Sequence, residues 1–386
     1  MNILFVTSRA IEVNASSSIR NLATIKGLIE NGHTITVCSM RPDPNNKYYD
    51  PNSQQLEVRK IYFKPEMVAA VKTAQRFNIF HTKLYRMLRG KRLYDGSKQI
   101  VNHVEEVNLS NFDIIISSSD PKSSHLFVEK LFERNGKHIP WIQIWGDPFA
   151  SDMTVHGDKR FIKKATEEES RLLSECDSVI YVSLATLEYQ KKAFPNSSKK
   201  MHYLPIPYLK KRILDNREKD NTFSIVYCGD YLSNIRNISP LYQAVNGMDG
   251  FRLDICGDSD IKLANSNNVS VRGRISYQEA STLEDNANIL VMICNLSGNQ
   301  IPGKIYQFAG TNKPILFVLD GNKKIFREQF QKYNRFVFCD NDSKSIRENL
   351  LKIRNENKKY LPLEDFDPKI VASKILQTIN ESELIK

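Results

Sequence analysis

Short apolar runs alternate with helical patterns along the first half of the chain, as in a doubly wound parallel sheet. Runs typical of buried strands cover residues 3–6, 34–38, 113–117, 141–145 and 179–182. Apolar residues recur every three or four positions over 16–30, and Asn31-Gly32 follows as a typical helix C-terminus. A second helix is expected over 124–135.

A second alternating unit begins near Phe223, after a polar stretch at 210–221 that is the best linker candidate. Its strand-like runs cover residues 223–228, 252–256, 269–271, 289–292 and 315–318. The pattern predicts an α/β fold with two Rossmann-like doubly wound domains that face each other across a cleft. We expect an N-terminal domain at 1–208 and a C-terminal domain at 209–366. A helix within 367–386 either completes the second domain or packs back on the first.

Ligands in such sheets bind at the carboxyl ends of the strands. The loops after Val6, Ser117, Trp145, Cys228 and Cys294 are therefore expected to line the cleft.

The segment 298–308 is expected to form a turn and a helix start directly after an apolar strand. Asn299, Gln300 and Lys304 crowd this start, where free backbone N–H groups and the helix dipole favour an anion such as phosphate. Gln307, about one turn further, is placed to reach a neighbouring hydroxyl. The alternative is an ordinary capped junction between a strand and a helix.

Other polar residues follow predicted strands. Arg236 comes shortly after the strand that ends before Gly229, and it is either a second cation for a diphosphate or a solvated surface arginine. Asp147 follows Gly146 at a strand end, as a ligand-orienting carboxylate or as a turn residue before proline. His125, in the predicted helix 124–135, is either a structural or an acceptor-side residue.

The composition limits the function classes. A chain of 386 residues, 41% hydrophobic, is long enough for two domains of roughly 150–200 residues. No run of 18 apolar residues occurs, and no charged leader precedes the first strand, so we expect neither a membrane span nor a signal peptide. The six cysteines form no Cys-x-x-Cys motif, which favours reduced core thiols in a cytosolic protein and no metal site.

The positive charge is concentrated in one segment. The net charge is +11, and residues 59–98 contain eleven Lys or Arg against two acids. Apolar residues recur at helical spacing between these cations, a pattern suited to an anionic membrane surface. The alternatives are a core-packed helix with a solvated basic face and, least favoured, a nucleic-acid patch, since no nucleic-acid-binding motif accompanies it.

Several enzyme classes lack their sequence motifs here. The chain has no Gly-x-Gly-x-x-Gly after its strands, no P-loop, no His-Glu-x-x-His and no Gly-x-Ser-x-Gly. These absences argue against dehydrogenases, P-loop phosphotransferases, zincins and serine hydrolases.

The order of the remaining motifs resembles family 4 glycosyltransferases, which are retaining sugar-nucleotide transferases of the GT-B fold. Matching motifs are Asn31-Gly32-His33, Asp147-Pro148-Phe149, Val182-Ser183, Leu204-Pro205-Ile206-Pro207, and Ile301-Pro302-Gly303-Lys304-Ile305-Tyr306-Gln307-Phe308 followed by Lys313-Pro314-Ile315-Leu316. The last motif resembles members that use UDP-sugars. The resemblance spans almost the whole chain.

The chain departs from the family at three places. The usual pair of glutamates falls on Asn299 and Gln307, and the usual basic residue of the second domain's first loop falls on Asp230. The glycine-rich first loop is replaced by a serine-rich one, in which Ser16, Ser17 and Ser18 are expected to cap the next helix.

The resemblance implies a metal-free site with three sets of residues. The catalytic set is Asp147, Arg236 and Lys304. The donor-binding set is Gly229, Asn299, Gln300, Ile301, Gly303, Lys304, Ile305 and Gln307. The acceptor-side set is Ser16, Ser17, Arg20 and His125.

The sequence therefore predicts a retaining glycosyltransferase of bacterial surface polysaccharide synthesis. It would transfer a sugar from a nucleotide donor, UDP-linked before others, to a lipid-linked saccharide or another glycan. It would act in the cytoplasm at the inner membrane face, held there by residues 59–98. The alternatives are a non-catalytic partner protein of the same fold and a sugar-nucleotide epimerase.

Overall fold

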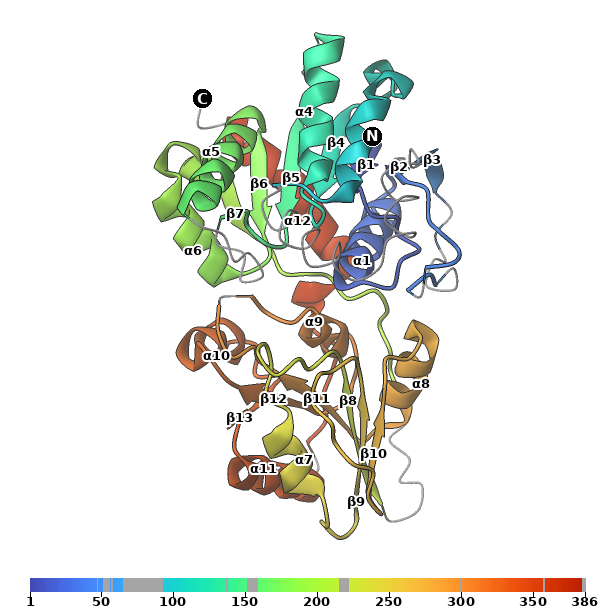
Figure 1. The fold of residues 1–386 in the computed structure, drawn as a ribbon, viewed down its shortest axis with the longest axis vertical. Helices are drawn as coiled ribbons and strands as arrows, with labels where there is room; N and C mark the ends of the chain where they lie inside the picture. The colour runs from blue at the N-terminus through green and yellow to red at the C-terminus, as the bar shows by residue number, and fades with distance from the viewer. Residues whose placement is uncertain are drawn as a thin grey trace, which may run out of the picture. The chain divides into compact units, whose positions relative to one another are not determined.

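The computed structural model describes residues 1–46, 48–50, 56, 58–64, 93–136, 138–150, 159–214, 222–298, 300–356 and 358–383. The chain divides into two compact units (Figure 1). Unit 1 comprises Met1–Tyr49, Gln55–Leu204 and Ala372–Lys386, and unit 2 comprises Asp50–Gln54 and Pro205–Val371.

In unit 1, the described residues form a parallel sheet of seven strands in the order β3-β2-β1-β4-β5-β6-β7. The strands are β1 (Asn2–Val6), β2 (Thr34–Met40), β3 (Arg59–Phe63), β4 (Ile114–Ser118), β5 (Trp141–Trp145), β6 (Ser178–Tyr181) and β7 (Met201–Tyr203). The strand order reverses between β1 and β4, where Phe5 is in register with Ile116. This reversal makes the sheet doubly wound, and in such sheets ligands bind at the carboxyl ends of the two strands where the order reverses.

Helices pack on the sheet of unit 1. They are α1 (Ser16–Glu30), η2 (Gly96–Glu106), η3 (Leu109–Asn111), α4 (Ser123–Asn135), α5 (Lys159–Glu175), α6 (Leu184–Ala193), η4 (Pro195–Lys200) and α12 (Pro368–Glu383). The last helix returns to unit 1 from the far end of the chain. In it, Thr378 Oγ1 accepts a hydrogen bond from Ser178 Oγ (2.7 Å), and Ser373 Oγ accepts one from Asn31 Nδ2 (3.1 Å).

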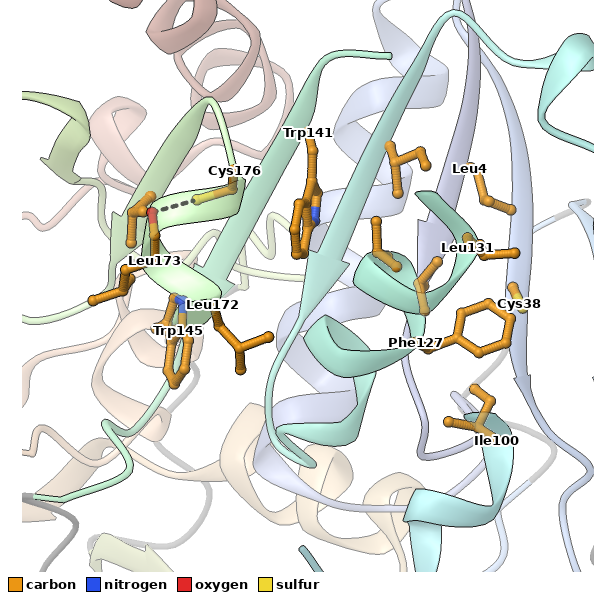
Figure 2. Packing of buried hydrophobic residues seen from close by; sticks show 14 of the residues in the cluster. Leu4, Cys38, Ile100, Phe127, Leu131, Trp141, Trp145, Leu172, Leu173 and Cys176 are labelled. Carbon is orange, nitrogen blue, oxygen red and sulfur yellow. Dashed lines mark hydrogen bonds between the residues drawn. The ribbon is translucent and has the colours of Figure 1, made fainter. Parts of the chain in front are cut away.

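The core of unit 1 is aliphatic and aromatic (Figure 2). Phe127 and Leu131 of α4 pack in the same cluster as Leu4 of β1. Trp141 and Trp145, which lie two positions before and two positions after Gln143 in β5, are fully buried. Burying such side chains supplies the main favourable free energy of folding, about 1.5–3 kcal/mol for each large apolar residue.

In unit 2, the described residues form a parallel sheet of six strands in the order β10-β9-β8-β11-β12-β13. The strands are β8 (Phe223–Cys228), β9 (Phe251–Cys256), β10 (Val269–Arg272), β11 (Ile289–Ile293), β12 (Ile315–Leu319) and β13 (Val337–Asp340). The helices are α7 (Ser239–Val245), α8 (Tyr277–Asn286), α9 (Lys304–Ala309), α10 (Lys323–Gln331), α11 (Ser343–Asn355) and η5 (Glu364–Phe366). Here the strand order reverses between β8 and β11.

The structure confirms the predicted α/β class with two Rossmann-like doubly wound sheets. All ten strand-like runs named from the sequence are strands, and the helix predicted over 16–30 has those bounds. Strands β3, β7 and β13 were not predicted. Of the linker candidate, residues 215–221 lie outside the described part of the chain, and Arg212 forms a β-bridge with Thr311.

Within the described ranges, none of the helices is both long and apolar enough to cross a membrane. The basic segment expected at a membrane surface falls largely on residues 65–92, which lie outside the described residues.

Candidate functional site

The carboxyl edge of unit 1 holds a buried arginine. Arg20, on α1, is only 5% exposed, and its Nη2 donates to the carbonyl oxygen of Ser119 and to Ser118 Oγ (3.1 Å). Burial lowers the pKa of Arg20, whereas the negative charges of Asp120 and Asp147 oppose that change. Gly146 makes room for this arginine, because a Cβ there would lie 2.6 Å from Arg20 Nη1.

Two carboxyl groups meet beside this arginine. Asp120 follows β4, Asp147 follows β5, and their side chains hydrogen-bond to each other. Burial alone would raise the pKa of Asp120, but Lys122, whose Nζ lies 2.9 Å from Asp120 Oδ1, lowers it, and the charge of Arg20 adds to this effect. The net result is a lowered pKa of Asp120, so its carboxyl group is ionised at physiological pH beside the cations Lys122 and Arg20.

Glu169 of α5 fixes the loop that carries Asp147 through hydrogen bonds. Glu169 is fully buried, and its Oε2 accepts hydrogen bonds from the backbone N–H groups of Phe149 (3.1 Å) and Ala150 (3.3 Å). Gln190 Nε2 donates to its other oxygen (3.1 Å). Burial raises the pKa of Glu169 to about 7, although these donors and Lys122 favour the ionised form.

His125 lies inside unit 1. Its ring has no exposed surface, stacks on Trp145 at 4.4 Å, and places Nδ1 2.7 Å from Ser117 Oγ. Trp141 Nε1 donates to the same hydroxyl (2.7 Å), so Ser117 Oγ joins the buried indole and imidazole rings. Burial lowers the pKa of His125 to about 3. The imidazole is therefore neutral at physiological pH.

The serine-rich loop does not cap α1, contrary to the sequence-based expectation. The N-cap residue is Ala15, which makes no side-chain cap hydrogen bond. Ser16, the first helical residue, is exposed, while Ser17 Oγ accepts from Arg9 Nη1 (2.9 Å) and Ser18 Oγ donates to the Ala10 carbonyl (3.3 Å). The hydroxyls are thus bonded to the loop before the helix.

The carboxyl edge of unit 2 brings two glycine loops into contact. Gly229 follows β8 and Gly257 follows β9, and a Cβ on Gly257 would lie 2.1 Å from the Gly229 carbonyl oxygen. Gly229 N donates to the Cys256 carbonyl (2.8 Å). Only glycine at 257 allows the two loops to pack this closely, since any side chain there would meet the backbone of Gly229.

Three hydrogen-bond acceptors hold Arg236 beside Gly229. Its Nη1 donates to the Asp230 carbonyl (2.7 Å) and to Tyr227 Oη (3.0 Å), and its Nη2 donates to Asn295 Oδ1 (2.8 Å). The Asp230 carboxylate binds Arg274 Nη1 instead (2.9 Å). The guanidinium of Arg236 therefore has a fixed position, and none of these three acceptors is a carboxylate.

Lys304 begins α9 and forms an ion pair with Glu284 of α8. Burial alone would lower the pKa of Lys304, but the charge of Glu284 raises it above its usual value. Glu284, only 3% exposed, also pairs with Arg212 Nη2 (3.2 Å). Arg212 Nη1 also pairs with Asp285 Oδ1 (2.5 Å), so the two cations are balanced by two carboxylates. Lys304 lies near the end of β8, where it acts electrostatically on Cys228.

The remaining residues of the donor-binding motif surround Lys304. Ile305 is fully buried in the core, whereas Gln300, Ile301 and Gly303 are half-buried. Gln307 is engaged with the chain that precedes unit 2's sheet: its Oε1 accepts from Leu209 N (2.8 Å) and its Nε2 donates to the Pro207 carbonyl (3.2 Å). Asn299 lies outside the described residues.

The structure thus gathers the candidate residues in two sets. Arg20 and Asp147 meet at the edge of unit 1, and Gly229, Arg236 and Lys304 lie at that of unit 2. Sequence reasoning missed three carboxylates, namely Asp120, Glu169 and Glu284. Only Asp120 had a signal, because it follows a predicted strand just as Asp147 does. Across the described residues, no cluster of His, Cys, Asp or Glu is suited to hold a metal ion.

Comparison with known proteins shows what the fold is. Neither a family model nor a curated protein matches the sequence. Among solved structures, TarM superposes with a TM-score of 0.57 at 10% identity, covering 100% of this chain and 97% of TarM. The chain has a GT-B fold.

Two further GT-B structures agree with this conclusion. The E. coli trehalose-6-phosphate structure bound with UDP-2-fluoro glucose gives a TM-score of 0.54 at 9% identity, covering 100% of this chain and 98% of the other. The apo lipopolysaccharide outer core galactosyltransferase WaaB gives 0.50 at 13% identity, covering 100% and 99%. At such low identity these similarities establish the fold alone.

Proposed function

We propose that this protein is a retaining glycosyltransferase that transfers a sugar from a nucleotide donor, UDP-linked before others, to a lipid-linked saccharide or another glycan. The observation that carries the proposal is the carboxyl edge of unit 2, where Arg236 and Lys304 lie beside the glycine loops of β8 and β9. The same fold in a structure bound with UDP-2-fluoro glucose supports a nucleotide-sugar donor.

The proposed chemistry at this edge is stabilisation of the leaving nucleoside diphosphate. Arg236 is preorganised by three hydrogen bonds, and a guanidinium fork matches phosphate oxygens. Lys304 adds a point charge, while the half-buried residues Ile301, Gly303 and Lys304 supply backbone N–H donors. Fixed positive charge where negative charge develops lowers the barrier without reorganisation in the transition state.

The proposed role of unit 1 is to orient hydroxyl groups. Asp147 accepts hydrogen bonds from sugar or acceptor hydroxyls, while Arg20, Gly146 and Glu169 hold its loop in place. Ser16 and Ser17 belong to the same proposed acceptor side. His125, which is fully buried, acts there only by supporting Trp145 and Ser117.

One observation favours the non-catalytic alternative. Gln307, at the position where the resemblance places a ribose-binding glutamate, already uses both ends of its amide on the backbone of 207–209. Its carbonyl oxygen has a second lone pair, so a ribose hydroxyl can still donate to it. A measurement of nucleotide binding distinguishes the proposed glycosyltransferase from the non-catalytic alternative.

The test is a thermal-shift and calorimetric panel of UDP, GDP, UDP-glucose, UDP-N-acetylglucosamine and GDP-mannose. A ligand that binds the folded state stabilises it by RT ln(1 + [L]/Kd), about 2.7 kcal/mol at a hundredfold excess over Kd. We expect selective stabilisation by UDP compounds in the wild type, reduced in Lys304→Ala. Lys324→Ala, which removes an 88% exposed lysine of α10, is the matched control. No binding of any nucleotide would favour the non-catalytic alternative.

The proposed membrane association through residues 59–98 has its own test. Sedimentation with vesicles that contain anionic lipid is expected to fall steeply as salt rises, because exposed charges are screened within about 8 Å at physiological ionic strength. Binding that is absent, or that is unchanged by salt, would contradict it.

A further inference from the structure

Two cysteines occupy neighbouring positions at the carboxyl edge of unit 2. Cys228 ends β8, Cys256 ends β9, and the two residues are register partners in this parallel pair. Neighbouring strands lie about 4.8 Å apart, and register partners point to the same face of a sheet. Disulfide-linked residues have Cα separations of about 4.4–6.8 Å. The sheet therefore holds these cysteines at a spacing that a disulfide can span.

The two cysteine side chains also interact with each other. The Cys228 and Cys256 side chains hydrogen-bond to each other, and both residues are buried, with 6% and 2% exposed. No other two cysteines in the described part of the chain are register partners: Cys339 of β13 is separated from Cys294, which follows β11, by strand β12. This pair is the product of sheet register and is invisible in the sequence, where 27 residues separate the two cysteines.

The two thiols differ in acidity. The hydrogen bond from Cys228 is the main cause that lowers the pKa of Cys256, and the guanidinium of Arg272 adds to it against the effect of burial. The same hydrogen bond raises the pKa of Cys228. Burial raises the pKa of Cys294 and of Cys339 to about 12, without a comparable partner. Cys256 is thus the better nucleophile, since the thiolate is the reactive form.

We propose that Cys228 and Cys256 form an oxidation site at which hydrogen peroxide converts the dithiol into a reversible disulfide. The Cys256 thiolate attacks one peroxide oxygen, the O–O bond breaks, and a sulfenic acid and hydroxide form. The sulfur of Cys228 then attacks the sulfenic sulfur, and its proton leaves with the hydroxyl as water. Overall, two thiols lose two electrons and two protons, and one peroxide becomes two waters.

The disulfide would tie β8 to β9 one residue before the glycine loops that touch each other. Gly229 and Gly257 directly follow the two cysteines, and Lys304 acts electrostatically on Cys228. The oxidation site therefore lies next to the proposed donor-binding edge, although its formation does not depend on the proposed function.

The test uses the full-length wild-type protein without a nucleotide. The protein is treated with hydrogen peroxide, unfolded in the presence of iodoacetamide, digested without reductant and analysed by peptide mass spectrometry. We expect a peptide that joins Cys228 to Cys256 and lacks two hydrogens, and its loss after dithiothreitol. Carbamidomethylated Cys228 and Cys256 after peroxide treatment would overturn the proposal, as would a cross-link between other cysteines.

Variants identify the roles of the two thiols. Cys228→Ser is expected to abolish the cross-link and leave sulfenic acid on Cys256, which dimedone labels; Cys256→Ser is expected to abolish both. Cys339→Ser is the matched control and is expected to keep the cross-link, because Cys339 is a buried cysteine of the same sheet whose register partner is Val318 and not a cysteine. Dimedone labelling of Cys228 in place of Cys256 would contradict the order of attack.

Discussion

The carboxyl edges of the two sheets have opposite characters on the same kind of scaffold. In unit 1 the edge presents carboxyl groups, Asp120 and Asp147, around a buried arginine. In unit 2 it presents cations, Arg236 and Lys304, beside glycine loops. Because both sheets are doubly wound and parallel, the difference comes from the side chains that the loops and the flanking helices place at each edge, such as Arg20 of α1 and Lys304 of α9. In the proposed function, a fold that places loops at equivalent edges would allow one unit to take hydroxyls and the other to take phosphate.

The largest expected effect is on turnover, and it distinguishes the proposed role of the unit 2 edge from that of the unit 1 edge. Arg236→Ala removes a charge aimed at the leaving diphosphate, so kcat/KM should fall about 10²–10³-fold, as when one preorganised donor is removed. Arg252→Ala is the matched control, because Arg252 is 61% exposed near the start of β9. Transfer is measured with the donor that the nucleotide panel selects. Full activity of Arg236→Ala would break the proposed division of roles.

The buried Glu169 of unit 1 predicts how the stability of the protein depends on pH. Burial raises the pKa of Glu169 to about 7 from its usual value of 4.5. Between these values the folded state keeps a proton that the unfolded chain has lost, so rising pH lowers stability until about pH 7. Such a pKa difference corresponds to about 3 kcal/mol. The expected result is that Glu169→Gln removes this fall in stability.

Urea unfolding of the wild type and of Glu169→Gln between pH 4.5 and 8 measures this difference. Glu167→Gln, on the exposed face of the same helix, is the matched control. A constant difference between the wild type and Glu169→Gln across this range would contradict the protonation of Glu169 in the folded state.

The smallest expected effect concerns the helix that carries Glu284 in unit 2. A capping box begins α8: Glu279 N donates to Ser276 Oγ (3.2 Å), and Ser276 N donates to Glu279 Oε2 (3.0 Å). Ser276→Ala is expected to cost about 1 kcal/mol in unfolding free energy while nucleotide affinity stays unchanged. Ser266→Ala, at an exposed loop position, is a control for loss of a hydroxyl. A large loss of UDP affinity in Ser276→Ala would show that the edge depends on helix stability.

Hydrophobic patterning accounts for most of the fold and little of the site. Buried parallel strands such as β5 and β11 are nearly continuous apolar runs, and these short runs identify them as strands. Strand β3, with the sequence Arg-Lys-Ile-Tyr-Phe, was missed because edge strands carry charge and lack that pattern. Strand β13 is likewise an edge strand of its sheet.

Residues of the candidate site were predictable from the sequence only where one rule sufficed, namely that ligand-binding residues follow the strands. Asp147, Gly229 and Arg236 were found because they follow strands. The partners of these residues come from distant segments: Glu284 joins Lys304 across 20 residues, and Leu209 joins Gln307 across 98. Such contacts are set by packing, which the local sequence does not encode. The Cys228–Cys256 pair is another product of sheet register.

The most direct measurement is calorimetric titration of UDP into the wild type, Arg236→Ala and Asp147→Asn. A donor site on unit 2 predicts a Kd raised at least about tenfold by Arg236→Ala, a loss of about 1.4 kcal/mol, and a Kd unchanged within about twofold by Asp147→Asn. The same titration on Arg252→Ala should match the wild type. Equal effects of the two site variants, or a weaker effect of Arg236→Ala than of Asp147→Asn, would contradict the assignment of the nucleotide to the cationic edge.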